Sequence, residues 1–137
     1  MIYSVSIFSH MSQEDQQGWL TELARITRPG GFFFLTTEGR FALDKLAPKF
    51  GSNVSQMQEK LNEQGFLYRS YEVWNKQVKV GDTVRPVSEV QGVSYGNAVM
   101  SPDYIQKNWP AAGFEVVGLL EGIIDHRQDL VVRRKRS

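Results

Sequence analysis

The most constraining feature of this chain is a Pro-Gly-Gly turn, Pro29 to Gly31, that separates an amphipathic segment from a run of apolar residues. Proline cannot continue a helix, because its ring fixes φ and its nitrogen has no hydrogen to donate. Glycine adopts the positive φ that a sharp reversal after a helix requires. The apolar run that follows, Phe32 to Leu35, is typical of a strand buried on both faces. The turn therefore predicts a helix–turn–strand unit within an α/β sheet that helices cover.

A strand and a helix are predicted on the N-terminal side of this turn. Residues 2–8 are mostly apolar or β-branched, which is typical of a strand. Ser12 is a good helix N-cap, and Asp15 three positions later completes a pattern like a capping box. We therefore expect a helix over about residues 13–27 whose apolar stripe packs against the sheet. The expected members of that stripe are Trp19, Leu23 and Ile26.

The C-terminal third of the chain predicts another helix and an antiparallel pair of strands. Ser101 followed by Pro102 marks a helix start, because serine caps a helix and proline fits its first turn. Two apolar runs, at about residues 114–124 and 129–135, are separated by a short polar segment. This pattern is typical of a hairpin.

The middle of the chain carries shorter signals. Helices are expected over about residues 41–47 and 54–64, the second because Asn53 is a good N-cap. Valine residues on both sides of Gly81 favour a hairpin. All these segments lie within residues 40–95.

Composition narrows the class of protein. The chain has 137 residues, of which 41% are hydrophobic and 23% charged, which is typical of a single globular domain over residues 1–137. No apolar run approaches about 20 residues and no signal peptide is apparent, so we expect a cytoplasmic protein without a membrane span. The net charge of +1 favours no particular partner. There is no cysteine, and His10 and His126 are too far apart in the sequence to indicate a metal site.

Two stretches of the chain resemble a known family. In residues 2–11 a strand ends in a short segment that carries His10, and in residues 25–35 a helix end leads through Arg-x-x-Arg-Pro-Gly-Gly into the next strand. This order resembles the second half of the class I S-adenosylmethionine-dependent methyltransferases. The predicted final helix and hairpin also resemble the C-terminal end of that family. The glycine-rich turn that follows a strand in the first half of the family has no counterpart in this sequence.

The resemblance implies a fold, a cofactor and a substrate. The fold would be α/β, a partial Rossmann-like methyltransferase sheet with two parallel strands, a C-terminal antiparallel hairpin and a substrate-side insertion at residues 40–95. The cofactor would be S-adenosylmethionine, and the substrate a small-molecule methyl acceptor. The residues that match the cofactor-lining end of a family strand are Ser4, Val5, Ser6 and Phe8. His10 matches the adjoining substrate side.

Each candidate residue also has a structural interpretation. His10 could act as a general base or orient a substrate hydroxyl or amine, but a lone histidine more often caps or packs. Phe8 could lie against the sulfonium group of a cofactor, where a desolvated cation gains about 0.5–2 kcal/mol from an aromatic face, or it could belong to the core. Tyr68 and Tyr95 could line an aromatic substrate pocket or pack the insertion.

The basic run at residues 133–136 has two interpretations as well. It could contact phosphates, as nucleic-acid-binding segments do. Such a run more often keeps an edge strand soluble and unpaired, so we expect no nucleic-acid partner.

Two functions remain open. The chain could be part of a complete methyltransferase, and would then be inactive or bind the cofactor weakly by itself. Alternatively, it could be a non-catalytic protein-interaction module or a dimeric remnant of the fold. In that case we expect it to pair with a second copy through the exposed edge of its first strand.

Overall fold

The chain folds around a mixed β-sheet, and the computed structural model describes residues 1–92, 94–110 and 113–136. The strand order of this sheet is β1 (Ile2–Ser4), β2 (Phe32–Glu38), β8 (Gln128–Lys135) and β7 (Phe114–Ile124). β1 and β2 are parallel, whereas β8 is antiparallel to both of its neighbours, β2 and β7. The predicted α/β class is confirmed at this level, with one parallel pair and a C-terminal hairpin.

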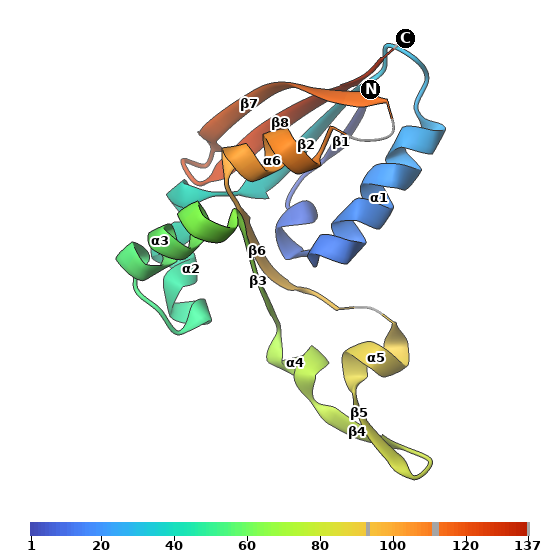
Figure 1. Cartoon of the computed structure of the whole chain (residues 1–137), viewed down its shortest axis with the longest axis vertical. Coiled ribbons are helices and arrows are strands. Elements are labelled where there is room, and N and C mark those ends of the chain that lie inside the picture. Colours follow the sequence, from blue (N-terminus) through green and yellow to red (C-terminus); the bar gives the residue numbers. More distant parts are fainter. Residues whose placement is uncertain (93, 111–112, 137) are drawn as a thin grey trace.

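The helix–turn–strand unit predicted around the Pro-Gly-Gly turn is present (Figure 1). The unit consists of β1, the helix α1 (Gln13–Ile26) and β2. The Ser12 hydroxyl caps α1 by accepting a hydrogen bond from the Asp15 amide. Gly30 has a φ of +78°, and a Cβ at Gly31 would lie 2.9 Å from the Arg28 carbonyl oxygen. Both glycines are therefore needed for the chain to reverse directly into β2.

β1 is shorter than the strand predicted over residues 2–8. It ends at Ser4, and Phe8–His10 form a 3₁₀ turn, η1, before α1 begins. Between them Ser6 has a φ of +56°, in the left-handed region that an extended strand does not contain. The backbone therefore leaves the sheet at Ser6, although the composition of this stretch suits a strand.

One face of the sheet is covered by α1 and by α6 (Pro102–Asn108), which form a core with it. The central residues of this core include Leu20, Leu23, Phe33, Leu35, Ile105, Trp109 and Val131. α1, with 14 residues, is the longest helix of the described part of the chain. None of the described helices is both long enough and apolar enough to cross a membrane.

The prediction of which residues form the apolar stripe of α1 is wrong in part. Leu23 is buried as expected, but Trp19 is 53% and Ile26 is 52% exposed. The helix is rotated because Gln16 is buried and its side-chain amide donates a hydrogen bond of 2.8 Å to the Phe8 carbonyl oxygen. This polar contact decides which face of α1 meets the sheet.

The opposite face of the sheet is partly exposed at the start of β2, which corrects the prediction of an apolar run buried on both faces. Phe33 and Leu35 point into the core and are 0% exposed, whereas Phe32 is 39% exposed. The Phe32 ring stacks on the Phe34 ring, with their centroids 6.5 Å apart. Leu120 of β7 lies on the same face as these two rings and is also exposed. The apolar run is suited to burial on both sides, but α1 and α6 cover one side.

A second group of elements packs around its own small core beside the sheet (Figure 1). Its members are η2 (Arg40–Ala42), α2 (Leu43–Leu46), η3 (Ala47–Phe50), α3 (Val54–Gln64), β3 (Phe66–Ser70) and β6 (Gly96–Met100). The helices expected over about 41–47 and 54–64 are confirmed, and Asn53 caps α3 as predicted. β3 and β6 form an antiparallel pair that stands apart from the four-stranded sheet.

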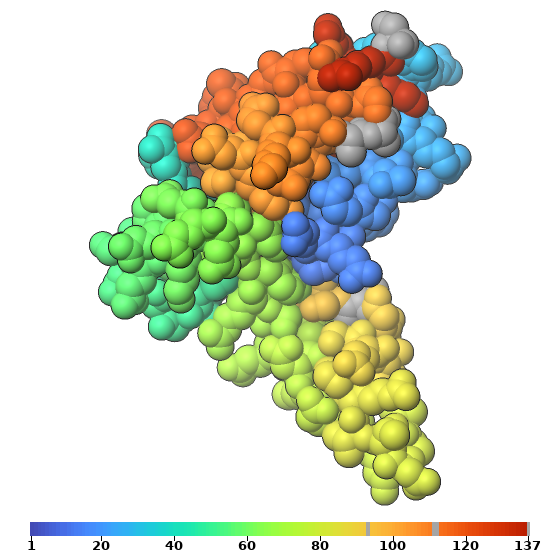
Figure 2. Space-filling view, viewed as in Figure 1, coloured from blue at the N-terminus to red at the C-terminus, as the bar shows by residue number. Residues whose placement is uncertain are grey.

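The segment between β3 and β6 forms an arm, defined here as residues 72–91, that extends away from the rest of the molecule (Figure 2). Its elements are α4 (Glu72–Asn75), β4 (Gln77–Val80), β5 (Thr83–Pro86) and α5 (Val87–Gln91). β4 and β5 pair around Gly81, which confirms the predicted hairpin. The arm is largely exposed to solvent, and Val84 at its tip is 64% exposed.

The basic run near the end of the chain takes part in the fold. Lys135 Nζ donates hydrogen bonds of 2.7 Å to the carbonyl oxygens of Ala24 and Thr27, and so caps the C-terminal end of α1. Arg133 is buried, with its guanidinium over the Phe114 ring. These two side chains join the last strand to the core on the covered face.

β8 is an inner strand, which corrects the expectation that the basic run protects an edge. It lies between β2 and β7. Arg134 and Arg136 at its end form ion pairs with Glu115 of β7, at 2.5 and 3.7 Å. These charges therefore have partners within the chain.

Candidate functional site

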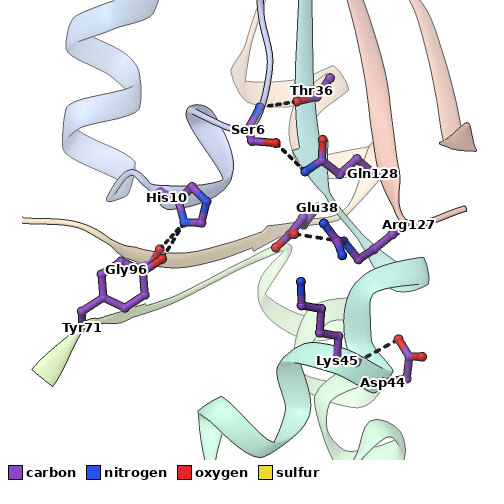
Figure 3. Close-up of polar contacts among 10 residues, drawn as sticks. All are labelled: Ser6, His10, Thr36, Glu38, Asp44, Lys45, Tyr71, Gly96, Arg127 and Gln128. Atoms are coloured by element: carbon purple, nitrogen blue, oxygen red, sulfur yellow. Dashed lines mark hydrogen bonds and ion pairs between the residues drawn. The ribbon is translucent and has the colours of Figure 1, made fainter. Parts of the chain in front are cut away.

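The carboxyl ends of the parallel strands β1 and β2 meet at one edge of the sheet, where α/β proteins commonly bind ligands. Ser6 follows β1 at this edge, and Glu38 is the last residue of β2. Gln128, the first residue of β8, pairs with Glu38. Figure 3 shows that polar residues from η1, α2 and the base of the arm converge on the same region. We take this convergence as the candidate site.

Ser6 is held in its left-handed conformation by two hydrogen bonds (Figure 3). Its backbone N–H donates to Thr36 Oγ1 at 2.8 Å, and its Oγ accepts from Gln128 Nε2 at 2.7 Å. A non-glycine residue at positive φ costs of order 1–3 kcal/mol and persists only where its surroundings hold it. The strain therefore fixes the direction in which the chain leaves β1 for η1.

His10 is fixed in one orientation by two neighbours at the base of the arm. Its Nδ1 lies 2.8 Å from the Gly96 carbonyl oxygen and 2.8 Å from the Tyr71 phenol oxygen. A carbonyl oxygen can only accept, so Nδ1 carries the hydrogen. In the neutral ring the lone pair is then on Nε2, which makes Nε2 the atom that can accept a proton.

Tyr71 stays protonated beside His10. Burial and the negative charge of Glu38 both raise the pKa of the Tyr71 phenol above its usual value. The Tyr71 oxygen lies 2.8 Å from the same Nδ1 that contacts the Gly96 carbonyl oxygen. The influence of Glu38 also shows that the carboxylate and the phenol belong to one electrostatic environment.

Glu38 is a buried carboxylate that forms one ion pair, at moderate distance, with the described residues. Its side chain is 6% exposed, and Oε1 lies 3.5 Å from Nε of Arg127. Oε2 receives no hydrogen bond from the described residues. Figure 3 shows Lys45 of α2 extending toward this carboxylate from the other side. The site thus combines a base, a phenol, a carboxylate and two cations.

The residues expected to line the cofactor are not gathered on one surface. Phe8 is 2% exposed and packs on Trp109, with ring centroids 5.5 Å apart, so its core interpretation holds. Ser6 already uses its N–H and its hydroxyl within the chain. The Ser4 hydroxyl is buried, whereas Val5 is 57% exposed. These four residues do not form a cradle that would hold S-adenosylmethionine by themselves.

The two tyrosines expected to bind substrate lie near the base of the arm. The Tyr68 hydroxyl is 3.0 Å from Ser94 Oγ, and burial raises the pKa of the Tyr68 phenol. Tyr95 is 44% exposed, and its ring lies 6.3 Å from that of Trp74. Tyr68 is close enough to Tyr71 to contribute to the raised pKa of Tyr71. The structure therefore brings Tyr68 near the His10 pair and leaves Tyr95 at its outer margin.

Gly96 is required by the close approach of β6 to β3. A Cβ at this position would lie 2.1 Å from the Arg69 carbonyl oxygen and 2.6 Å from Ser70 Cα. Only glycine fits, and its own carbonyl then faces His10. The same feature that allows the strand pair also fixes the histidine.

His126 lies in the turn between β7 and β8, is exposed and has a φ of +55°. This agrees with its interpretation as a solvated turn residue. Among the described residues no group of three or more histidine, aspartate or glutamate side chains is placed to hold a metal ion.

Arg127 and Gln128 were not predicted as site residues. Gln128 lies 122 positions from the Ser6 hydroxyl that it contacts, and Tyr71 lies 61 positions from His10. The strand order places Gln128 next to the end of β2, and this order has no local signal in the sequence. Gly96, a glycine next to Tyr95, is the sequence signal that could have pointed to a partner of His10.

Models of known protein families and curated proteins were compared with this chain, and no match was found.

Proposed function

We propose that this chain is the acceptor-binding part of an S-adenosylmethionine-dependent methyltransferase that acts on a small molecule. The observation that carries the proposal is the polar cluster at the carboxyl ends of a parallel strand–helix–strand unit. The sequence of this unit resembles the second half of the class I family, and the parallel pair and final hairpin agree with the arrangement that the resemblance implies. A partial Rossmann-like sheet with a substrate-side insertion at residues 40–95 is part of the proposal.

In this proposal His10 prepares the acceptor for methylation. The Nδ1–H bond to the Gly96 carbonyl leaves Nε2 free to take the proton of an acceptor hydroxyl or amine. Loss of that proton raises the nucleophilicity of the oxygen or nitrogen. Tyr71 keeps the imidazole ring in place through its contact with the same Nδ1. S-adenosylmethionine would supply the methyl group, and the contribution of the chain would be to place the acceptor in line for transfer.

The cofactor itself is assigned to a glycine-rich half outside these residues. The four residues matched to the cofactor-lining strand end do not form a cradle, because Phe8 is in the core and Ser6 has used its polar groups. A glycine-rich turn after a strand is what brings backbone amides close to such a ligand. The chain alone is therefore expected to bind the cofactor weakly.

Calorimetric titration of S-adenosylhomocysteine tests the proposal. We expect the reading frame upstream of Met1 to encode a strand and a glycine-rich turn about 40–60 residues earlier. The extended protein should bind in the micromolar range, and the 137-residue chain at least about a hundredfold more weakly. An extension without such a turn, or an extended protein that does not bind, would contradict the methyltransferase assignment. Micromolar binding to the 137-residue chain would instead show that this chain completes the site.

A second candidate function is a dimeric interaction module, which is favoured by an apolar surface around the first strand. β1 pairs with β2 and has no second neighbour among the described strands. The exposed side chains along this edge and on the flank of α1 are Met1, Tyr3, Val5, Ile7, Trp19 and Ile26. An unpaired strand edge invites pairing with another chain, and two copies related by a twofold axis would extend the sheet.

Light scattering over a wide range of protein concentration tests this candidate. We expect a dimer that the Tyr3→Lys variant converts into a monomer, because the charge would lie at the paired edge. Ile123→Lys serves as the control, since Ile123 is 54% exposed but lies on β7, at the other edge of the sheet. A wild-type chain that stays monomeric at high concentration would exclude the dimer.

A further inference from the structure

We propose that Glu38 is the binding group for a hydroxyl or an ammonium group of the small molecule that occupies the site. The inference rests on the proposed function for the role of His10. It adds the chemical class of the acceptor, which is a molecule with a nucleophilic O–H or N–H group and a second hydrogen-bond donor.

Glu38 is buried without being satisfied by the fold. Its side chain is 6% exposed, and Oε2 receives no hydrogen bond from the described residues. Oε1 lies 3.5 Å from Arg127 Nε, which is longer than a normal N–H···O hydrogen bond. A buried carboxylate is costly unless it is paired and hydrogen-bonded. One carboxylate oxygen is therefore left for a donor that comes from outside the chain.

The position of Glu38 fits a ligand that also reaches His10. Figure 3 shows the carboxylate between Arg127 on one side and the His10–Tyr71 pair on the other. The charge of Glu38 raises the pKa of the Tyr71 phenol, so the two groups are electrostatically coupled. In this arrangement a single ligand would give a proton to His10 Nε2 and donate a hydrogen bond to Oε2 of Glu38.

Two other roles for Glu38 agree less well with the geometry. As a counter-ion for Arg127 alone, it would be expected to form a shorter, hydrogen-bonded pair. As a metal ligand, it would need further carboxylate or histidine partners, and none are grouped around it among the described residues. A neutral hydroxyl or a cationic amine satisfies Oε2 without either difficulty. An ammonium group should bind better than a hydroxyl, because its hydrogen bond is assisted by opposite charges.

Four phenols that differ in one side-chain group test the inference by ligand-observed NMR on the full chain. The probes are tyramine, tyrosol, para-ethylphenol and para-hydroxyphenylpropionate, which carry an ammonium, a hydroxyl, no polar group and a carboxylate. Each presents a phenol proton to the base. We expect tyramine to bind about tenfold more tightly than para-ethylphenol, with the affinity of tyrosol between them. A tenfold change in affinity is about the size expected for one hydrogen bond to a charged group.

Two variants assign the difference to Glu38. Glu38→Gln keeps an acceptor oxygen but removes the charge, so it should weaken tyramine about tenfold and change tyrosol by less than about threefold. Asp44→Asn is the matched control, because Asp44 is an exposed carboxylate on α2 near the same site. It should change the affinity of neither probe. The amide spectrum of each variant establishes that it is folded.

Several outcomes would overturn the inference. They are equal binding of tyramine and para-ethylphenol, preferred binding of para-hydroxyphenylpropionate through Arg127 and Lys45, no detectable binding of any probe, or a folded Glu38→Gln variant with unchanged preferences. If Glu38→Gln does not fold, the ranking of the four probes on the wild-type chain still decides. None of these measurements uses the cofactor. Glu38-dependent binding together with a failed S-adenosylhomocysteine titration would therefore reject methyl transfer while keeping this ligand class.

Discussion

The two faces of the four-stranded sheet are built from similar residues but have different surroundings. Phe33 and Leu35 face α1 and α6 and are 0% exposed. Phe32 and Leu120, on the other face, are 39% and 49% exposed. Both faces are apolar enough to form a core, but α1 and α6 cover one of them.

The difference shows that an apolar sequence makes a strand face suitable for burial but does not establish that the face is buried. A strand that is apolar on both faces is typical of a sheet covered by two layers. Here the second layer is not supplied by α1 or α6, so the bare face is a place where additional polypeptide could pack. This agrees with the proposal that a further half, or a second copy, completes the molecule.

The sharpest test of the comparison uses two adjacent phenylalanines of β2. Phe33→Ala should lower the free energy of unfolding by about 3–5 kcal/mol, because it leaves a cavity in the core. Phe32→Ala should lower it by less than about 1 kcal/mol, since the ring is already partly in water. Urea unfolding followed by tryptophan fluorescence measures both. Equal losses would mean that the second face is covered in solution.

Asp129, a titratable residue on the covered face, is expected to make the stability of the protein depend on pH. Burial raises the pKa of the Asp129 carboxyl from 3.8 to about 6, although the carboxylate accepts a hydrogen bond of 2.8 Å from the Gly122 amide. The folded state therefore binds this proton more tightly than the unfolded state. Stability should fall as the pH rises from about 4 to above 6, with a total loss of about 3 kcal/mol.

The Asp129→Asn variant should remove this part of the pH dependence. It keeps the acceptor for the Gly122 amide and carries no charge. Chemical unfolding of the wild type and the variant at pH values below and above the titration of Asp129 measures how much of the pH dependence is lost. A variant whose pH dependence matches that of the wild type would show that Asp129 titrates normally.

A smaller effect is expected where the last strand meets α1. Lys135→Met should cost about 1 kcal/mol, because the two carbonyl oxygens at the C-terminal end of α1 lose their donor. Lys79→Met on the exposed arm should cost less than about 0.5 kcal/mol and provides the control. Thermal unfolding compares the two, and similar shifts would argue against the cap.

The smallest effect on stability is expected on the bare face. Leu120→Lys should change the free energy of unfolding by less than about 0.5 kcal/mol, because the lysine stays in water. Leu119→Lys, one position earlier, points toward the core and should be clearly destabilising. Chemical unfolding distinguishes them. A large loss for Leu120→Lys would locate a covering layer on this face.

Elements with strong local signals could be predicted from the sequence. Ser12, Asn53 and Ser101 begin three helices as expected, and the two hairpins follow their apolar runs. The orientation of α1 could not be predicted, because it depends on a buried hydrogen bond from Gln16 to the Phe8 carbonyl. Amphipathic patterns treat such a glutamine as a surface residue.

The candidate site was predictable only in part. His10 was located by its place in the strand–helix–strand pattern. The partners of His10 and Ser6 come from segments 61 to 122 positions away, and only the tertiary fold brings them together. Glu38 was one of several carboxylates in the sequence, and its burial at the end of β2 separates it from the exposed ones.

The inner position of β8 has a consequence for synthesis of the protein on the ribosome. β7 joins the sheet only by pairing with β8, and β8 follows β7 in the chain. Until β8 has left the exit tunnel, the edges of β2 and β7 that face it have no hydrogen-bonding partner. The nascent chain is therefore expected to depend on chaperones until β8 is available, and a chain that terminates within β8 should be degraded.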